Sequence, residues 1–169
     1  SERSFNPAAR GRLEIPIQRI TLYGGGSYLQ TRERPNFEID ARARQVASEV
    51  QLGVEVDVFR KLSLDLTLAR FRTRFDADAV FFGTFLEKSL NREEQTATLT
   101  GRWRRNALTT LTLTTEVGSA LFQFEPERDT DSVSVSVGAE FNPRALVSGT
   151  GSIGVKRFQP FRSSTIPVF

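Results

Sequence analysis

Charged side chains with a regular spacing are the residues of this sequence that could do chemistry. In several segments they alternate with Val and Leu and share their parity with Ser and Thr. Alternate side chains of a β-strand point to opposite faces, so these charges would lie on one polar face. Charges on a sealed core face are costly unless they are paired, whereas a hydrated interior tolerates them. We interpret nine of them as lining a polar lumen: Glu49, Glu55, Asp57, Asp65, Arg102, Arg104, Glu116, Glu140 and Lys156.

Two roles are open for this set. The acids come mainly from the earlier segments, and Arg102 and Arg104 come from a later one. If the strands close, a transverse field across the lumen would tune ion selectivity. Alternatively, the charges pair with one another and fill a narrow, non-conducting interior. The number of strands decides between the two, and the sequence leaves both open.

Enzymatic and metal chemistry are not predicted. Cysteine and histidine are both absent, which excludes a thiolate zinc site, a Cys nucleophile and a Ser-His-Asp relay. Gly149–Gly154 matches G-x-G-x-x-G, but it lies inside an alternating segment with no helix after it, so no nucleotide site is expected. Aspartates such as Asp76 and Asp129 fall in loops, where they usually bond to their own turns. We therefore predict a non-enzyme with no catalytic residue, no cofactor and no metal ligand; weak Ca²⁺ binding by loops is a lesser alternative.

Long alternating segments dominate the chain, and helical periodicity is weak. Residues 42–58, 62–75 and 108–124 are 14 to 17 residues long, where globular strands are usually about 5–6 and tilted membrane strands about 9–11. Short links near residues 18, 60, 105 and 143 alternate with longer charged links at 31–41, 76–91 and 125–131. This asymmetry is typical of outer-membrane barrels.

The predicted fold class is therefore all-β. We expect an up-and-down antiparallel transmembrane β-barrel, or an open segment of one, with about seven or eight strands. Residues 1–169 form one domain, with irregular ends at 1–11 and 159–169. The net charge of +3 is small and the arginines are scattered, so nucleic-acid binding is not expected.

Three arginines pose a separate question. The segment Lys61–Phe75 puts four leucines and then Arg70, Arg72 and Arg74 on the same parity. These arginines either form an outer rim that faces anionic lipopolysaccharide, or a bulge near Ala69 turns them into the lumen and turns Phe71 and Phe75 to lipid. The bulge is the favoured interpretation because it keeps aromatics on lipid and charges in water.

Aromatic residues gather toward the predicted strand ends, as interfacial girdles would require. The alternative is that they are core aromatics of a soluble sheet. They are Tyr23, Tyr28, Phe59, Phe71, Phe75, Trp103, Phe122, Phe124, Phe141 and Phe158.

Four segments give the chain a resemblance to a known family. They are GRLEIPIQRITLYGGGSYLQTRERPNFEID, RKLSLDLTLARFRTRFDAD, TGRWRRNALTTLTLTTEVGS and FNPRALVSGTGSIGVKRFQP. Together they resemble the bacterial outer-membrane β-barrel porin family, over nearly the whole chain up to about Pro160. The resemblance implies a barrel with more strands than this chain supplies, and hence a fragment. The last nine residues, FRSSTIPVF, do not look like a membrane strand because Pro167 interrupts the ladder.

The predicted function is porin-like passive diffusion of small polar solutes or ions in the bacterial outer membrane. The expected partners are outer-membrane lipid, lipopolysaccharide and the solutes themselves. Two alternatives stay open: a non-conducting structural or adhesion barrel that binds a partner through its long loops, and a soluble extracellular β-sheet binding module.

Overall fold

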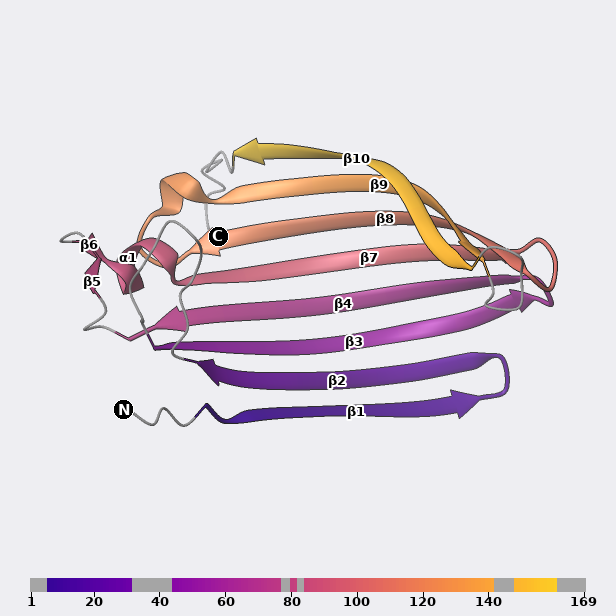
Figure 1. Cartoon of the computed structure of the whole chain (residues 1–169), viewed down its shortest axis with the longest axis horizontal. Helices are drawn as coiled ribbons and strands as arrows, with labels where there is room; N and C mark the ends of the chain where they lie inside the picture. Colours follow the sequence, from indigo (N-terminus) through magenta and orange to yellow (C-terminus); the bar gives the residue numbers. More distant parts are fainter. Residues whose placement is uncertain (1–5, 32–43, 77–79, 82–83, 142–147, 161–169) are drawn as a thin grey trace, which may run out of the picture.

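Eight long strands form one antiparallel sheet in chain order (Figure 1). This is a computed structural model that describes residues 6–31, 44–76, 80–81, 84–141 and 148–160. The strands are β1 (Ala8–Ile17), β2 (Ile20–Thr31), β3 (Gln45–Phe59), β4 (Leu62–Phe75), β7 (Arg92–Arg104), β8 (Thr109–Phe122), β9 (Thr130–Phe141) and β10 (Gly149–Pro160). The predicted all-β, up-and-down antiparallel architecture is confirmed.

The links differ at the two ends of the sheet, which we call the short-turn end and the long-loop end. Two residues join β1 to β2, and two join β3 to β4. The link from β4 to β7 at the opposite end contains β5 (Val80–Phe81), β6 (Thr84–Phe85) and the helix α1 (Leu86–Leu90), and the link from β8 to β9 contains the 3₁₀ turn η1 (Pro126–Arg128). Figure 1 shows α1 beside the ends of β4 and β7.

The sheet is open. β1 and β10 lie at its two edges, and no strand in the described part of the chain pairs with their outer sides. The described strands therefore form an open sheet and not a closed eight-stranded barrel. β1 begins at Ala8 and β10 extends to Pro160, so both stretches predicted to be irregular, 1–11 and 159–169, contain strand residues.

The register places nearly all of the Val, Leu and Ile side chains on one face, which we call the apolar face. Its central row runs across all eight strands and consists of Ile15, Leu22, Val54, Leu66, Leu99, Thr115, Val135 and Val155. The opposite face, which we call the polar face, carries Ser, Thr and charged residues at the intervening positions. The alternation read from the sequence thus becomes two chemically different surfaces.

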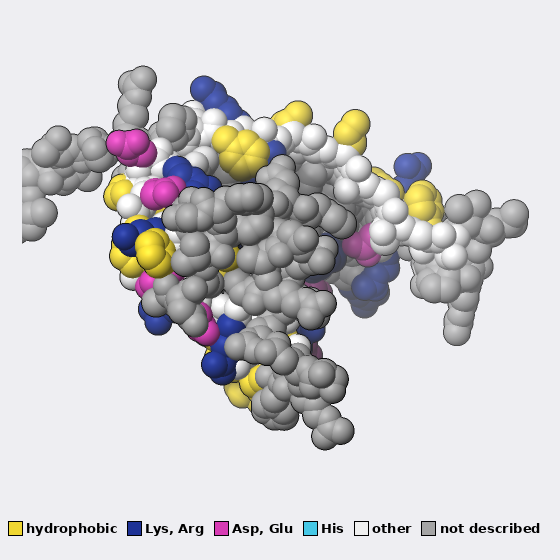
Figure 2. All heavy atoms as spheres, turned by 60° about the vertical axis from the view of Figure 1, so that its left-hand side comes forward, with side chains coloured by type: hydrophobic (Ala, Val, Ile, Leu, Met, Phe, Trp, Pro, Cys, Tyr) yellow, Lys and Arg dark blue, Asp and Glu magenta, His cyan; other side chains and the backbone are white. Residues whose placement is uncertain are grey.

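The apolar face is exposed. Leu13 is 65 % exposed on β1, Leu68 is 53 % exposed in the middle of the sheet, and Ile153 is 82 % exposed on β10. Among the described residues only Phe75 and Leu86 are buried hydrophobics. Figure 2, which brings the long-loop end forward, shows hydrophobic side chains at the surface beside Lys and Arg. A second layer that would cover this face is not found among the described residues, so the sheet has no conventional core.

The sheet curls toward its polar face. A Cβ atom on Gly154, which lies on the polar face of β10, would come within 2.7 Å of the Val135 carbonyl oxygen on β9. A Cβ atom on Gly151, on the apolar face of the same strand, would have no atom within 4 Å. Crowding on one face and open space on the other indicate a concave polar face. In Figure 1 the first half of β10 accordingly crosses in front of β9 and β8.

A tyrosine clasp on the polar face ties three strands together. The Tyr23 hydroxyl on β2 donates a hydrogen bond of 2.7 Å to Asp65 on β4, and it lies 2.5 Å from the Thr67 hydroxyl. The ring passes over Gly53 on β3, where any β-carbon would overlap it. Thr67 also donates to Asp65 over 2.9 Å, and Asp65 is buried. Glycine at position 53 therefore permits contact between strands that are not neighbours.

We expect Gly53→Ala to break this clasp. The new methyl group displaces the Tyr23 ring, and the loss of its hydrogen bonds lowers the free energy of unfolding by about 1–2 kcal/mol. Urea unfolding in detergent micelles measures the change.

Two further variants control this experiment. Gly151→Ala, on the open apolar face, should change stability by less than about 0.5 kcal/mol. Adding Gly53→Ala to Tyr23→Ala should cost little, because the ring is already absent. A full additional loss in that double variant would show that Gly53 acts independently of Tyr23.

Candidate functional site

The polar face brings together the nine charged residues predicted to line a lumen. The strand register puts all of them on this face. Asp57, Arg104 and Glu140 lie near the short-turn end, where β3, β7 and β9 finish. Asp65 belongs to the tyrosine clasp, and Glu49 accepts a hydrogen bond of 3.2 Å from Ser27.

Two ion pairs on this face cross an intervening strand. Arg102 on β7 lies 3.7 Å from Glu55 on β3, and Lys156 on β10 lies 3.3 Å from Glu116 on β8. Both Lys156 and Glu116 are in register with Ser134 of β9, so the pair passes over a small side chain. Strands two apart in a flat sheet are separated by roughly 9.5 Å. Contacts of this kind therefore fit the concave shape of the polar face.

These pairs remain partly hydrated. The Glu55 and Arg102 side chains are 41 % and 38 % exposed, so each pair stabilises the sheet only weakly. One acid of the earlier strands, Glu55, and one arginine of a later strand, Arg102, thus meet across the concave face.

The three arginines of β4 lie on the apolar face. The register of β4 with β7 is unbroken from Leu62 to Thr73, and its register with β3 is unbroken past Arg70 to Phe75. The bulge favoured from the sequence near Ala69 is therefore wrong. The register shift lies instead in β3, between Asp57 and Phe59, and Phe71 and Phe75 stay on the polar face.

A carboxylate organises two of these arginines. Glu93 on β7 lies 2.7 Å from Arg70 and 2.8 Å from Arg72. Arg70, Arg72 and Gln95 all donate hydrogen bonds to the Glu93 carboxylate. This cluster lies past the end of the apolar band, toward the long-loop end.

The aromatic residues divide between the faces. Phe59, Trp103 and Phe141 lie on the apolar face at the short-turn end, where an interfacial girdle was expected, and Tyr28 lies on the same face near the other end. The girdle predicted for the second group is wrong, because the register turns these side chains to the polar face. The second group consists of Tyr23, Phe71, Phe75, Phe122 and Phe158.

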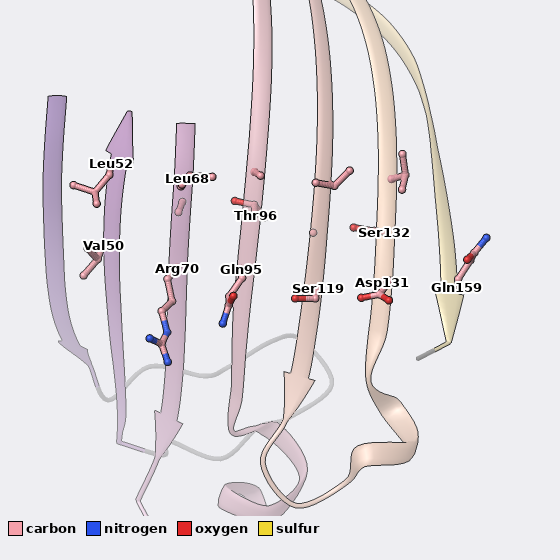
Figure 3. A pocket seen from close by; sticks show the side chains of 15 residues that line it. Val50, Leu52, Leu68, Arg70, Gln95, Thr96, Ser119, Asp131, Ser132 and Gln159 are labelled. Carbon is pink, nitrogen blue, oxygen red and sulfur yellow. The ribbon is translucent and has the colours of Figure 1, made fainter. Parts of the chain in front are cut away.

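The apolar face carries two hollows. The larger is a shallow groove of about 750 Å³ across β3, β4, β7, β8 and β9, and Figure 3 shows it from close by. A polar row crosses its edge nearest the long-loop end: Arg70, Gln95, Ser119, Asp131 and Gln159. The smaller hollow, of about 240 Å³, lies beyond this row at the ends of β4, β7 and β8.

Asn91 is a structural residue that sequence reasoning missed. It is 3 % exposed, its side-chain oxygen accepts a 2.7 Å hydrogen bond from the Phe75 backbone N–H, and its amide reaches Gln123 over 3.4 Å. Its own backbone N–H donates to Glu87. Asn91 therefore joins α1 to the ends of β4 and β8. A lone asparagine before a strand gives no sequence signal for this role.

The described part of the chain holds neither a metal-binding cluster nor a membrane-spanning helix. No group of three or more His, Cys, Asp or Glu side chains could hold a metal ion. No helix in these residues has the length and apolarity needed to cross a membrane.

Comparison with known proteins gives no relative. No family model, curated protein or solved structure matches the chain. The resemblance to outer-membrane porins therefore stays a prediction.

We expect Asn91→Ala to lower the free energy of unfolding by about 1–3 kcal/mol, because the buried Phe75 N–H loses its acceptor. Asn106→Ala is the matched control, since Asn106 also accepts backbone hydrogen bonds, from Leu108 and Thr109, but is exposed to water. Denaturant unfolding of both variants compares them. An equal loss of unfolding free energy in the two variants would contradict the expectation that burial makes the Asn91 hydrogen bond the more important one.

Proposed function

We propose that this chain forms part of the wall of a bacterial outer-membrane β-barrel. The apolar face would contact lipid, and the polar face would line a hydrated lumen. The observation that carries the proposal is the exposed apolar band, which crosses all eight strands while the opposite face is polar and concave. A sheet with apolar residues on its outer face and polar residues inside has the inverse pattern of a soluble barrel.

The energetics favour a nonpolar neighbour for the apolar face. Burial of one Leu, Ile or Val side chain is worth about 1.5–3 kcal/mol. Leu52, Leu99 and Val137 are 61 %, 48 % and 55 % exposed on adjoining parts of the band. Contiguous apolar surfaces of this kind are rare on soluble monomers. Lipid would cover the whole band without requiring a second protein layer.

The apolar band covers most of the height of a hydrocarbon layer. Its uninterrupted apolar positions run from Leu62 to Leu68 on β4 and from Val133 to Phe141 on β9. At about 3.3 Å per residue these segments extend roughly 20–26 Å along their strands. With strands tilted by about 35–45°, this corresponds to roughly 15–20 Å along the axis of a membrane barrel, whose outward apolar band is about 25 Å tall.

The open edges are part of the proposal. β1 and β10 present backbone N–H and C=O groups that must be satisfied in lipid, where water is absent. Further strands would therefore pair with both edges. A wall of more than eight strands encloses a wider lumen, which supports passage of small polar solutes or ions.

A non-conducting structural barrel is the second candidate. The clasp of Tyr23 with Asp65 and the pairs Arg102–Glu55 and Lys156–Glu116 place side chains across the concave face. If strands added at the edges enclose only a narrow interior, these contacts would help to fill it. The soluble binding module finds less support, because it leaves the apolar face in water.

Insertion into lipid is tested by placing a lysine on each face. Leu66→Lys, at the centre of the apolar band, should weaken partition into phosphatidylcholine vesicles by about 2–4 kcal/mol. Thr98→Lys, on the polar face of neighbouring β7, is the matched control and should have a much smaller effect. The blue shift of the fluorescence of Trp103, the single tryptophan, measures insertion. Equal effects of the two lysines, or no shift in the unaltered protein, would contradict the proposal.

Conductance in planar bilayers separates the open from the blocked barrel. If the polar face lines a conducting lumen, Arg102→Gln combined with Arg104→Gln should shift ion selectivity toward cations, because two positive charges leave the lumen. Arg19→Gln with Lys61→Gln, in the short turns, removes the same charge elsewhere. Insertion without conductance would favour the structural barrel.

A further inference from the structure

The apolar face carries a cationic hollow next to an apolar groove. The hollow of about 240 Å³ lies at the ends of β4, β7 and β8. Of its charged residues, Arg72, Arg74 and Glu93 lie on the apolar face, whereas Arg92 is in register with Phe122 on the polar face and pairs there with Glu94. Its charged lining therefore holds a net positive charge. Anions with phosphate geometry are the ligands that arginines recognise best, through paired N–H donors.

The larger groove adjoins this hollow along the same strands. Its wall toward the short-turn end is apolar and includes Leu52, Leu68, Val117 and Val133. Arg70 lies at its opposite edge, two residues along β4 from Arg72. Figure 3 shows Arg70 and Gln95 next to each other at this edge, with Leu68 and Leu52 farther along the strands. From the short-turn end toward the long-loop end, the apolar face thus carries the apolar groove, its polar edge and the cationic hollow.

Glu93 positions the arginines between the two hollows. It pairs with Arg70 at 2.7 Å and with Arg72 at 2.8 Å, so one carboxylate holds both guanidinium groups close together. Gln95 donates a further bond of 3.0 Å to Glu93. The other carboxylates near these hollows are Glu94, which pairs with Arg92, and Asp131, which lies on the far side of the groove. Positive charge therefore predominates on β4.

We propose that the groove and the cationic hollow together form a binding site for an anionic lipid, with its phosphate headgroup at Arg70, Arg72 and Arg74 and an acyl chain along the groove. This inference rests on the proposed membrane location of the apolar face. The charge complementarity favours a lipid over a second copy of the chain, because a partner sheet would have to bury the arginines and Glu93 at its interface. A lipid leaves the guanidinium groups at the hydrated headgroup level, where they bind phosphate.

The test uses vesicles of equimolar phosphatidylcholine and phosphatidylglycerol. The full chain is inserted, then extracted in mild detergent, and the lipids that remain bound are counted by native mass spectrometry. We expect phosphatidylglycerol to be retained in preference. Arg70→Gln, Arg72→Gln and Arg74→Gln should each lower that preference roughly five-fold, the contribution of one cation near an anionic surface. Arg19→Gln, Lys61→Gln and Arg105→Gln, at the short-turn end, are the matched controls.

A variant that is expected to raise the lipid preference strengthens the test. Glu93→Gln removes the negative charge between Arg70 and Arg72 and should raise the preference for phosphatidylglycerol. A preference unaffected by the β4 variants, or lowered equally by the controls, would overturn the lipid site. The site would also be overturned if Glu93→Gln lowered the preference as the β4 arginine variants do. The preference would then depend on the structure of the sheet and not on positive charge.

Two readouts separate the sources of failure. The Trp103 fluorescence shift reports insertion in pure phosphatidylcholine, so its absence contradicts the membrane proposal, whereas a normal shift without lipid preference contradicts only the site. Glycerol phosphate carries the headgroup without acyl chains. If it displaces phosphatidylglycerol, the hollow binds a free phosphate and the assignment of the groove to an acyl chain is wrong.

Discussion

An eight-stranded sheet whose apolar face has no second layer over it among the described residues is the constraint on which the rest of this structure depends. In most β proteins two sheets, or a sheet and helices, cover each other's apolar sides. Here the described strands bury only Phe75 and Leu86, both at the long-loop end. The apolar face is therefore exposed in the part of the chain that the structure describes. This exposure, more than any single side chain, supports the proposed contact with lipid.

Curvature is the second consequence, and the polar face maintains it. Tyr23 reaches across Gly53, and Lys156 reaches Glu116 across Ser134. Each contact needs a long side chain, a small residue beneath it and a sheet that bends toward that face. The same contacts place charge and hydroxyl groups inside the curve. One set of residues thus produces both the bend of the sheet and the polarity of its concave face. Curvature at defined positions distinguishes a curved sheet from a flat one.

The strands, their faces and the short turns near residues 18 and 60 could be predicted from the sequence, but the position of the bulge could not. Residues 62–75 were predicted as a strand and form β4 with those bounds. The nine charged residues fall on one face as expected. The predicted bulge near Ala69 was wrong because it was placed to keep Phe71 on lipid, whereas the register shift arises at Val58, where β3 meets the short turn. Aromatic position along a strand says nothing about which face the ring takes.

The sequence by itself determined the alternation, because successive side chains of an extended backbone point to opposite faces whatever its neighbours are. It also determined the order of the hairpins, since short links can only join adjacent antiparallel strands. Only the tertiary structure decided that Glu93 meets two arginines, that Asn91 joins α1 to two strand ends, and that the edges of β1 and β10 stay apart. Those features depend on cross-strand register and on curvature. Both are set by pairs of strands distant in sequence, which no local pattern encodes.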